Sequence, residues 1–332
     1  MILLGQTLEQ LQLLCASEGF PKFTARQICD WLYVKRVETI DAMTNLSLKT
    51  RARLNEIASV GRHAPTLCQV SSDGTKKYLF DTIEAVFIPD GDRATLCISC
   101  QKGCKMGCRF CVTGQQGFHG NLSAAEILNQ LFSIPECSQI TNIVYMGMGE
   151  PMDNYDNILA STQVLTSDWG LAWSPHRITV SSVGVIPALQ RFLQESQCHL
   201  AISLHNPIPQ ERLSIMPMEK TYPIAEVVSM LKQHDWHGQR RLSFEYTLFK
   251  GLNDDLVHAA KLVQLLKGLN CRVNLIRFHS SPGTPFQTSP KANIEAFQNY
   301  LNNHGLTCTL RASRGEDIMA ACGLLAGKGL GK

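Results

Sequence analysis

The sequence between residues 97 and 111 is Cys97-Ile-Ser-Cys100-Gln-Lys-Gly-Cys104-Lys-Met-Gly-Cys108-Arg-Phe-Cys111. A single free cysteine is commonly buried as a small apolar residue. Five thiols in so short a stretch need another explanation, because thiolates are the ligands of soft metals and the groups of redox chemistry. This stretch therefore indicates a metal or redox centre, and its surroundings decide the fold.

Two kinds of metal site fit these thiols. A zinc site would use the pairs Cys97/Cys100 and Cys108/Cys111, but only seven residues separate the pairs and Cys104 is left over. An iron–sulfur cluster would use Cys104, Cys108 and Cys111, in a C-x3-C-x2-C arrangement. The sequence favours the cluster, and zinc stays the alternative.

Three thiolates leave one iron of a [4Fe–4S] cube without a protein ligand. A small molecule can chelate that open iron. Phe110, the aromatic residue directly before the last cysteine, makes the triad similar to the radical S-adenosylmethionine pattern.

The composition limits the protein class. The chain has 332 residues, of which 44% are apolar and 18% charged, and its formal net charge is +3. It is long enough for a large core and for two domains, and too weakly charged for a polybasic protein. No run approaches the roughly 18 apolar residues of a membrane span, and the first residues lack a secretory signal. We expect a cytoplasmic protein with no membrane partner.

The thirteen cysteines are an odd number in a long chain, so reduced thiols are favoured over a disulfide framework. Seven of them lie far from the cysteine-rich stretch among apolar neighbours, and we expect these to be buried core residues. They are Cys15, Cys29, Cys68, Cys137, Cys198, Cys271 and Cys308.

Four parts follow from the patterning. Residues 1–65 show helical apolar stripes and predict an accessory domain, which either contacts RNA or is a solvated bundle. Residues 66–93 alternate around Asp73-Gly74, which predicts a linking β-hairpin or extension. Residues 94–311 form the main α/β domain, and 312–332 are a C-terminal segment carrying Cys322.

In the main domain, short β-rich runs alternate with helical periods, which predicts a parallel sheet of six β/α units and weakly favours a partial (β/α)6 barrel. The runs begin at residues 95, 142, 177, 199, 242 and 272, and the clearest helices cover 123–134, 255–268 and 291–304. The cysteine triad follows the first strand, where such barrels carry their sites.

Polar residues follow the other predicted strands. Gly147-Met-Gly-Glu-Pro151 fails the G-x-G-x-x-G pattern, so Glu150 either accepts hydrogen bonds from a ligand ammonium or simply sits in a tight turn. Ser181-Ser182 and Ser203-Leu204-His205 end two further strands, and together they indicate a polar ligand pocket facing the triad. Cys322 before a glycine is either structural or a nucleophile delivered to the barrel mouth.

The chain resembles the RlmN family of radical S-adenosylmethionine RNA methyltransferases, which is related to Cfr, over essentially its whole length. The landmarks are Glu84-Ala-Val-Phe-Ile-Pro, Arg93-Ala-Thr-Leu-Cys97, the triad with Phe110, Gln115-Gln-Gly-Phe, Gly147-Met-Gly-Glu-Pro, Ser203-Leu-His and Arg314-Gly-Glu-Asp-Ile…Ala-Ala-Cys322-Gly.

This resemblance implies a [4Fe–4S] cluster on Cys104, Cys108 and Cys111 and two S-adenosylmethionine molecules consumed per methylation. Cys322 would take a methyl group, lose a hydrogen atom from it to a 5′-deoxyadenosyl radical, and add to C2 of an adenosine. Glu84 would accept the C2 proton, and Cys97 would release the product by forming a transient disulfide with Cys322. The implied cofactor contacts are Gly149, Glu150, Ser181, Ser203, Leu204, His205 and His279.

The implied substrates are 23S rRNA, in the peptidyl-transferase region, and tRNA beside the anticodon. The implied partner is an external electron donor such as a flavodoxin-type reductant, and we expect a monomer. His279 and Cys100 depart from the family pattern, where Asn and Ser are usual. Cys100 is either harmless or a competitor of Cys97.

Two alternatives stay open. One is a Cfr-like enzyme acting at C8, although Gly149-Glu-Pro151 and Arg314-Gly-Glu-Asp317 look like RlmN. The other is a non-enzymatic zinc-ribbon RNA-binding protein. The candidate phosphate contacts, each of which is otherwise a solvated charge, are Arg240, Arg241, Lys250, Arg311 and Arg314.

Overall fold

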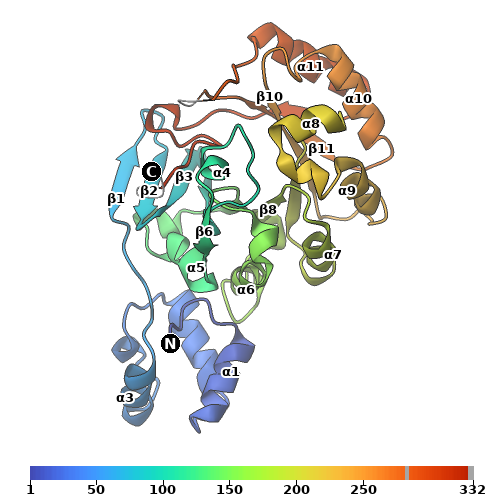
Figure 1. The fold of residues 1–332 in the computed structure, drawn as a ribbon. Coiled ribbons are helices and arrows are strands. Elements are labelled where there is room, and N and C mark those ends of the chain that lie inside the picture. Colours follow the sequence, from blue (N-terminus) through green and yellow to red (C-terminus); the bar gives the residue numbers. More distant parts are fainter. Residues whose placement is uncertain (281–283, 328–332) are drawn as a thin grey trace.

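The computed structural model describes residues 1–280 and 284–327. Figure 1 shows a group of N-terminal helices at one end and a large twisted sheet lined by helices along the rest of the chain. No helix in the described ranges is both long and apolar enough to cross a membrane.

A ten-stranded sheet forms the frame, in the order β1-β2-β3-β4-β7-β8-β9-β10-β11-β12. Its strands are β1 Leu67–Val70, β2 Lys76–Phe80, β3 Ile83–Asp90, β4 Arg93–Cys97, β7 Asn142–Tyr145, β8 Ile178–Ser182, β9 His199–Ser203, β10 Leu242–Leu248, β11 Arg272–Arg277 and β12 Cys308–Leu310. From β4 to β12 every neighbouring pair is parallel. The mixed α/β class and the six predicted parallel strands are confirmed; β12 is a seventh that the sequence did not predict.

The strands β1, β2 and β3 pair antiparallel with one another and, through β3, with β4. The turn between β1 and β2 falls at Asp73-Gly74, as predicted, and Gly74 has φ +84°, a value that glycine adopts without strain. These strands therefore extend the main sheet at its β4 edge, and we call them the β1–β3 extension.

The helices cover one face of the parallel sheet (Figure 1). After the N-terminal helices α1 Leu8–Ser17, α2 Thr24–Cys29 and α3 Leu48–Ile57 come α4 Val112–Gln115, α5 Ala124–Phe132, α6 Tyr155–Thr166, α7 Ile186–Glu195, α8 Pro209–Ile215, α9 Ile224–Leu231, α10 Leu256–Leu266 and α11 Lys291–Asn303. The predicted capping box is present at α5, where Ser123 and Glu126 satisfy each other's backbone N–H groups. Gly305 follows α11 with φ +79°, as a C-terminal glycine should.

The cysteine-rich loop is framed by a small second sheet. Its strands are β5 Gln101–Gly103 and β6 Phe118–Asn121, which pair antiparallel. A Cβ on Gly103 would lie 1.9 Å from the carbonyl oxygen of Gly117, so only glycine fits there. The sequence did not predict this pair of strands, because both are too short to show an alternation of apolar and polar residues.

The C-terminal segment, residues 312–327, leaves β12 and returns to the β1–β3 extension (Figure 1). It contains one 3-10 turn, Glu316–Ile318. The last five residues of the predicted 312–332 segment lie outside the described residues.

The core contains five of the seven cysteines predicted to be buried, but not all of them. Cys68 is exposed on β1, all four residues of which are exposed, and Cys271 is half-buried. The expectation for Cys68 is wrong because its neighbours in sequence belong to an edge strand rather than to the core.

Candidate functional site

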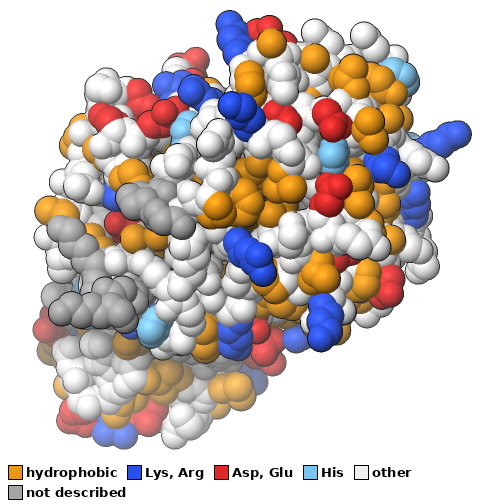
Figure 2. Space-filling view, turned by 45° about the horizontal axis from the view of Figure 1, so that its top comes forward, with side chains coloured by type: hydrophobic (Ala, Val, Ile, Leu, Met, Phe, Trp, Pro, Cys, Tyr) orange, Lys and Arg blue, Asp and Glu red, His pale blue; other side chains and the backbone are white. Residues whose placement is uncertain are grey.

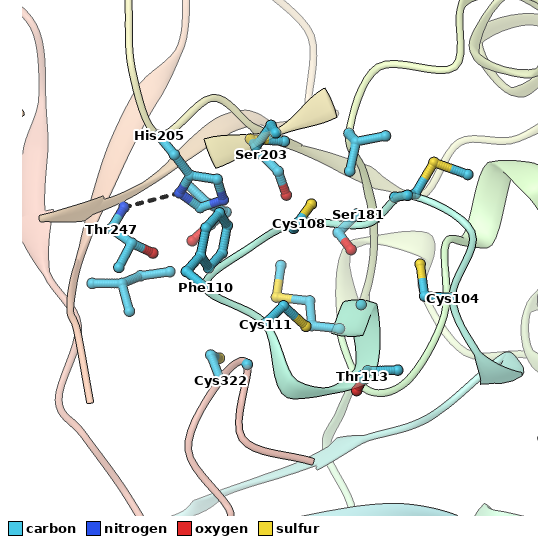
Figure 3. A pocket seen from close by; sticks show the side chains of 18 of the residues that line it. Cys104, Cys108, Phe110, Cys111, Thr113, Ser181, Ser203, His205, Thr247 and Cys322 are labelled. Atoms are coloured by element: carbon cyan, nitrogen blue, oxygen red, sulfur yellow. Dashed lines mark hydrogen bonds between the residues drawn. The ribbon is translucent and has the colours of Figure 1, made fainter. Parts of the chain in front are cut away.

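The predicted cluster ligands line one cavity of about 150 Å³. Cys104 and Cys108 are buried and Cys111 is half-buried, and all three come from the loop between β5 and α4. Figure 3 shows their sulfur atoms around one side of the cavity, with Cys322 on the C-terminal segment entering from another. The structure thus brings the predicted triad together.

The donor set fits a [4Fe–4S] cluster, since three thiols line one cavity and in a cube each thiolate binds its own iron. Within residues 1–280 and 284–327, no group of three His, Cys, Asp or Glu side chains is placed to hold a single metal ion. Burial raises the pKa of Cys104 to about 12, so its thiolate needs a metal cation to form at neutral pH.

Cys97 and Cys100 do not join the triad. Cys97 lines a second, larger cavity of about 520 Å³. Cys100 is buried, lies beside Cys104 and Glu150, and lines neither cavity. The zinc pair Cys97/Cys100 is therefore divided between two environments, since Cys97 lines the second cavity and Cys100 lines neither.

Five of the seven predicted cofactor contacts line the cavity of the triad. They are Gly149, Glu150, Ser181, Ser203 and His205, which lie at the carboxyl ends of β7, β8 and β9 or just beyond. A Cβ on Gly149 would lie 2.5 Å from Cβ of Gln101, so the chain passes too close for a side chain. The five predicted contact residues and the three cysteines therefore line the same cavity.

Glu150 is buried and its carboxylate is held by the backbone. Oε1 accepts a hydrogen bond from the N–H of Met152 at 3.1 Å, and Oε2 accepts one from the N–H of Val183 at 3.0 Å. Burial raises the pKa of Glu150 to about 7 despite these bonds. A bound ammonium would favour its charged form, which suits the predicted contact with an amino group.

His205 is neutral and fixed in orientation. Its Nδ1 accepts a hydrogen bond from the N–H of Thr247 at 3.0 Å (Figure 3), and burial together with the nearby Arg212 lowers its pKa to about 3. Phe110 meets its ring edge-on at 4.9 Å. His205 therefore offers an uncharged ring and one fixed N–H to a ligand.

The remaining two predicted contacts lie elsewhere. Leu204 is fully buried and does not line the cavity, although its backbone carbonyl accepts a hydrogen bond from Arg212 Nε. His279 lines the second cavity, where its Nε2 pairs with the Ser313 hydroxyl at 2.7 Å and its Nδ1 lies 3.4 Å from Glu316.

Cys322 lines both cavities, and it is the only predicted catalytic residue that does so. The residue is exposed to solvent, although protein atoms surround its thiol. Burial raises its pKa, and the guanidinium of Arg311 opposes that rise. Arg311 acts in the same way on Cys97, whose pKa burial also raises.

Arg311 and Glu245 lie where the two cavities meet, and Glu245 was not predicted from the sequence. Arg311 Nη1 lies 3.6 Å from Glu245 Oε2, which has no hydrogen-bond partner among the described residues. Glu245 Oε1 accepts from the Asn274 amide at 2.8 Å. A buried carboxylate with a free oxygen is a signal that appears only once the strands are assembled.

Glu84 is buried but lines neither cavity. Its Oε1 pairs with Lys77 Nζ at 3.3 Å, and its Oε2 accepts from the N–H groups of Ala326 at 2.9 Å and Gly327 at 3.2 Å. In this arrangement the C-terminal segment covers the Glu84 carboxylate.

Arg212 was also missed, although it organises the strand ends. It is fully buried, its Nη1 pairs with Glu219, and its Nη2 donates to the carbonyls of Val183 and Ser203, both at 3.0 Å. It thereby ties the ends of β8 and β9 together beneath the triad's cavity. Arg212 could not be predicted from the sequence, because a single arginine after Ser203-Leu204-His205 belongs to no apolar or polar pattern.

The candidate phosphate contacts divide. Arg240 is buried and donates to the carbonyls of Cys198 and Leu193, so its prediction as an RNA contact is wrong. Arg241 and Lys250 are exposed. On the face shown in Figure 2, Lys and Arg side chains are dispersed among polar and apolar ones.

Comparisons with known proteins find similarity over nearly the whole chain. The ribosomal RNA large subunit methyltransferase N-terminal domain matches residues 1–60, and the radical SAM superfamily matches residues 98–263. The chain is 56% identical over 329 residues to a probable dual-specificity RNA methyltransferase RlmN of Phocaeicola vulgatus, covering 98% of this chain and 94% of that protein. It is 44% identical over 333 residues to the dual-specificity RNA methyltransferase RlmN of Syntrophus aciditrophicus, covering 98% and 96%.

A solved structure is similar over nearly the whole chain. The crystal structure of a radical SAM methyltransferase from Sphaerobacter thermophilus superposes with a TM-score of 0.91 at 38% identity, covering 98% of this chain and 99% of that one.

Proposed function

The chain belongs to the RlmN family of radical S-adenosylmethionine RNA methyltransferases, and from that premise we propose that it methylates C2 of adenosine in 23S rRNA and in tRNA. One observation carries the proposal: Cys322 lies where the cavity of the cysteine triad meets the second cavity. A methyl carrier must reach both the cofactor and the RNA base, and a thiol that borders both cavities supports that role.

In this proposal Cys104, Cys108 and Cys111 hold a [4Fe–4S] cluster. Gly149, Glu150, Ser181, Ser203 and His205 hold S-adenosylmethionine beside it, with lesser roles for Leu204 and His279. When bound, the cluster and cofactor supply a 5′-deoxyadenosyl radical, at the expense of an electron from a flavodoxin-type donor.

The second cavity receives the adenine in this proposal. Its volume of about 520 Å³ suits a base with its sugar, and Arg93 and Arg314 line it together with the cysteines. Arginine guanidinium groups at such a mouth suit RNA phosphates.

The thiols then act in sequence. Cys322, as thiolate, takes a methyl group from one S-adenosylmethionine, which leaves as S-adenosylhomocysteine. That methyl group would give up one hydrogen atom to the 5′-deoxyadenosyl radical before its carbon bonds to C2, and the adduct would then lose one electron to the cluster and the C2 proton to Glu84. Cys97, as thiolate, attacks the Cys322 sulfur; the S–S bond forms as the S–C bond breaks, and the released carbon takes up a proton to become the methyl group of the product. Because Ala326 and Gly327 occupy the Glu84 carboxylate, this part of the C-terminal segment must withdraw when RNA enters. A monomer in the reducing cytoplasm fits this use of free thiols.

The test is mass analysis of nucleosides from RNA treated with the anaerobically reconstituted enzyme. We expect 2-methyladenosine in 23S rRNA and tRNA, with two S-adenosylmethionine molecules consumed per methyl group. The product 8-methyladenosine alone would show a Cfr-like specificity, and a colourless zinc-loaded protein without product would show an RNA-binding protein of another class.

A further inference from the structure

The C-terminal segment is attached to the turn between β1 and β2 by two carboxylates. Asp73 Oδ2 accepts a hydrogen bond from the N–H of Gly315 at 2.9 Å. Asp317 Oδ1 accepts from the Ser71 hydroxyl at 2.5 Å, and its Oδ2 accepts from the N–H of Ser72 at 3.0 Å. One carboxylate thus comes from each side, and both are charge-assisted acceptors.

The backbone of the segment fits closely against the same turn. Gly315 has φ +62°, and a Cβ there would lie 2.9 Å from Cγ2 of Thr75 and 2.8 Å from Cβ of Ala320. The buried Lys77 on β2 donates from Nζ to the carbonyl of Met319 at 3.4 Å. The contact therefore involves shape as well as charge.

The other end of the segment is attached to the cluster loop. The N–H of Val112 donates to the carbonyl of Gly323 at 2.8 Å, and the Thr113 hydroxyl donates to the carbonyl of Leu325 at 2.6 Å. Val112 and Thr113 begin α4, directly after Cys111. Cys322 lies between the two attachments.

We propose that Asp73 and Asp317 form a latch through which the β1–β3 extension positions Cys322 between the two cavities. They are positioning residues, since they touch neither cavity. Their hydrogen bonds to the segment and to the turn lower the pKa values of both carboxyl groups, so both are ionised at neutral pH. The β1–β3 extension would thus have a role in placing Cys322, besides extending the sheet at its β4 edge.

The latch sets the effective concentration of Cys322 at Cys97. A tethered group that is held near its partner reacts at a far higher effective concentration than one on a loose chain. This inference rests on the proposed pairing of Cys322 with Cys97. Its test uses thiol exchange without RNA or S-adenosylmethionine, so it fails separately from the proposed methylation.

The experiment equilibrates the cluster-loaded enzyme anaerobically with reduced and oxidised glutathione. Two thiols of the protein lose two protons and two electrons to form one disulfide, while one glutathione disulfide becomes two glutathione thiols. Peptide mapping after alkylation gives the fraction of Cys97–Cys322 disulfide. In the variant Asp73→Asn/Asp317→Asn, one oxygen of each carboxylate becomes an NH2 group. That group faces an N–H or O–H donor and cannot accept its hydrogen bond. We therefore expect the effective concentration of Cys322 at Cys97 to fall about tenfold or more.

The matched control is Asp168→Asn, which removes an exposed carboxylate paired with Arg26 on the N-terminal helices. It should keep the wild-type equilibrium. The double variant should keep the brown absorption of the cluster and the wild-type melting temperature, which a general structural defect would change.

A second variant acts from the segment's own side. Gly315→Ala places a methyl group against Thr75 of the β1–β2 turn while every residue of that turn, Asp73 included, stays the same. It should lower the effective concentration in the same direction. If both variants form the disulfide at the wild-type equilibrium, the latch does not position Cys322 and the inference is overturned.

Discussion

Cys97 at the end of β4 and Cys322 on the C-terminal segment face the same cavity, although the whole parallel sheet separates them in sequence. Neither belongs to the triad that lines the smaller cavity, but Cys322 borders it. In the proposed function the smaller cavity holds the cofactor and the larger one the substrate, and Cys322 is the thiol that borders both.

Replacing a triad cysteine should abolish the cluster. Cys104→Ala removes one of three thiolates, and we expect the anaerobically reconstituted variant to be colourless, with no iron bound stoichiometrically. Cys68→Ala, on the exposed edge strand β1, is the control and should stay brown. Optical absorption and iron analysis decide this; a brown Cys104→Ala protein with full iron content speaks against the assignment.

Replacing Glu84 should slow the methylation of RNA but not the methylation of Cys322. Glu84→Gln removes the proposed proton acceptor while keeping its shape, and we expect the rate of RNA methylation to fall by about 10²-fold or more. Methylation of Cys322 itself, measured by peptide mass, should continue. The control is Glu136→Gln, which alters the half-buried pair of Glu136 with Lys76, the residue next to Lys77. Equal loss of both half-reactions contradicts a proton-transfer role and points to displacement of the C-terminal segment.

Arg212 should be required for stability. Arg212→Met leaves Glu219 buried without its cation, and removal of one partner of a buried pair costs about 3–5 kcal/mol. Denaturant unfolding measures this. Arg212→Met/Glu219→Leu, which removes both charges, should recover much of the loss. A single variant within about 0.5 kcal/mol of wild type would show that the pair does not hold the ends of β8 and β9.

His199 should make stability depend on pH. Burial, with Arg241 and His176 nearby, lowers its pKa to about 4 in the folded protein, against about 6.5 when unfolded. As pH falls below 6.5 the unfolded chain binds the proton first, so the free energy of unfolding decreases, by about 2 kcal/mol at pH 5.

The comparison that isolates this effect uses His199→Gln, whose amide oxygen can still accept the N–H of Arg241 in place of Nδ1. Unfolding free energies at pH 7 and pH 5 should differ less in the variant than in wild type. Equal differences in both proteins would rule out His199 as the group responsible.

The sequence predicted those parts of the fold that local patterns determine. The capping box Ser123–Glu126 and the turn at Asp73-Gly74 join residues a few positions apart, and each of the six parallel strands is recognisable by itself as a short β-rich run. The strand β12 was not predicted, because three residues are too few to show an alternating pattern. It forms by pairing with β11 at the edge of the sheet.

Most residues of the site could be predicted from the sequence. Their positions relative to one another could not. The spacing of Cys104, Cys108 and Cys111 identified the triad, because ligands close in sequence must be close in space. The cover that Ala326 and Gly327 place over Glu84 joins distant segments. Arg240 shows the opposite error, since a charge in a polar run is expected outside and here donates to carbonyls inside.

The central claim is that Cys322 carries the methyl group to RNA and Cys97 releases it. Cys97→Ala, incubated anaerobically with S-adenosylmethionine, reductant and RNA, measures this most directly. We predict a covalent protein–RNA adduct, which nuclease digestion and peptide mass analysis locate at Cys322, and no adduct in Cys97→Ala/Cys322→Ala. Normal release of methylated RNA by Cys97→Ala, without any adduct, would contradict the account.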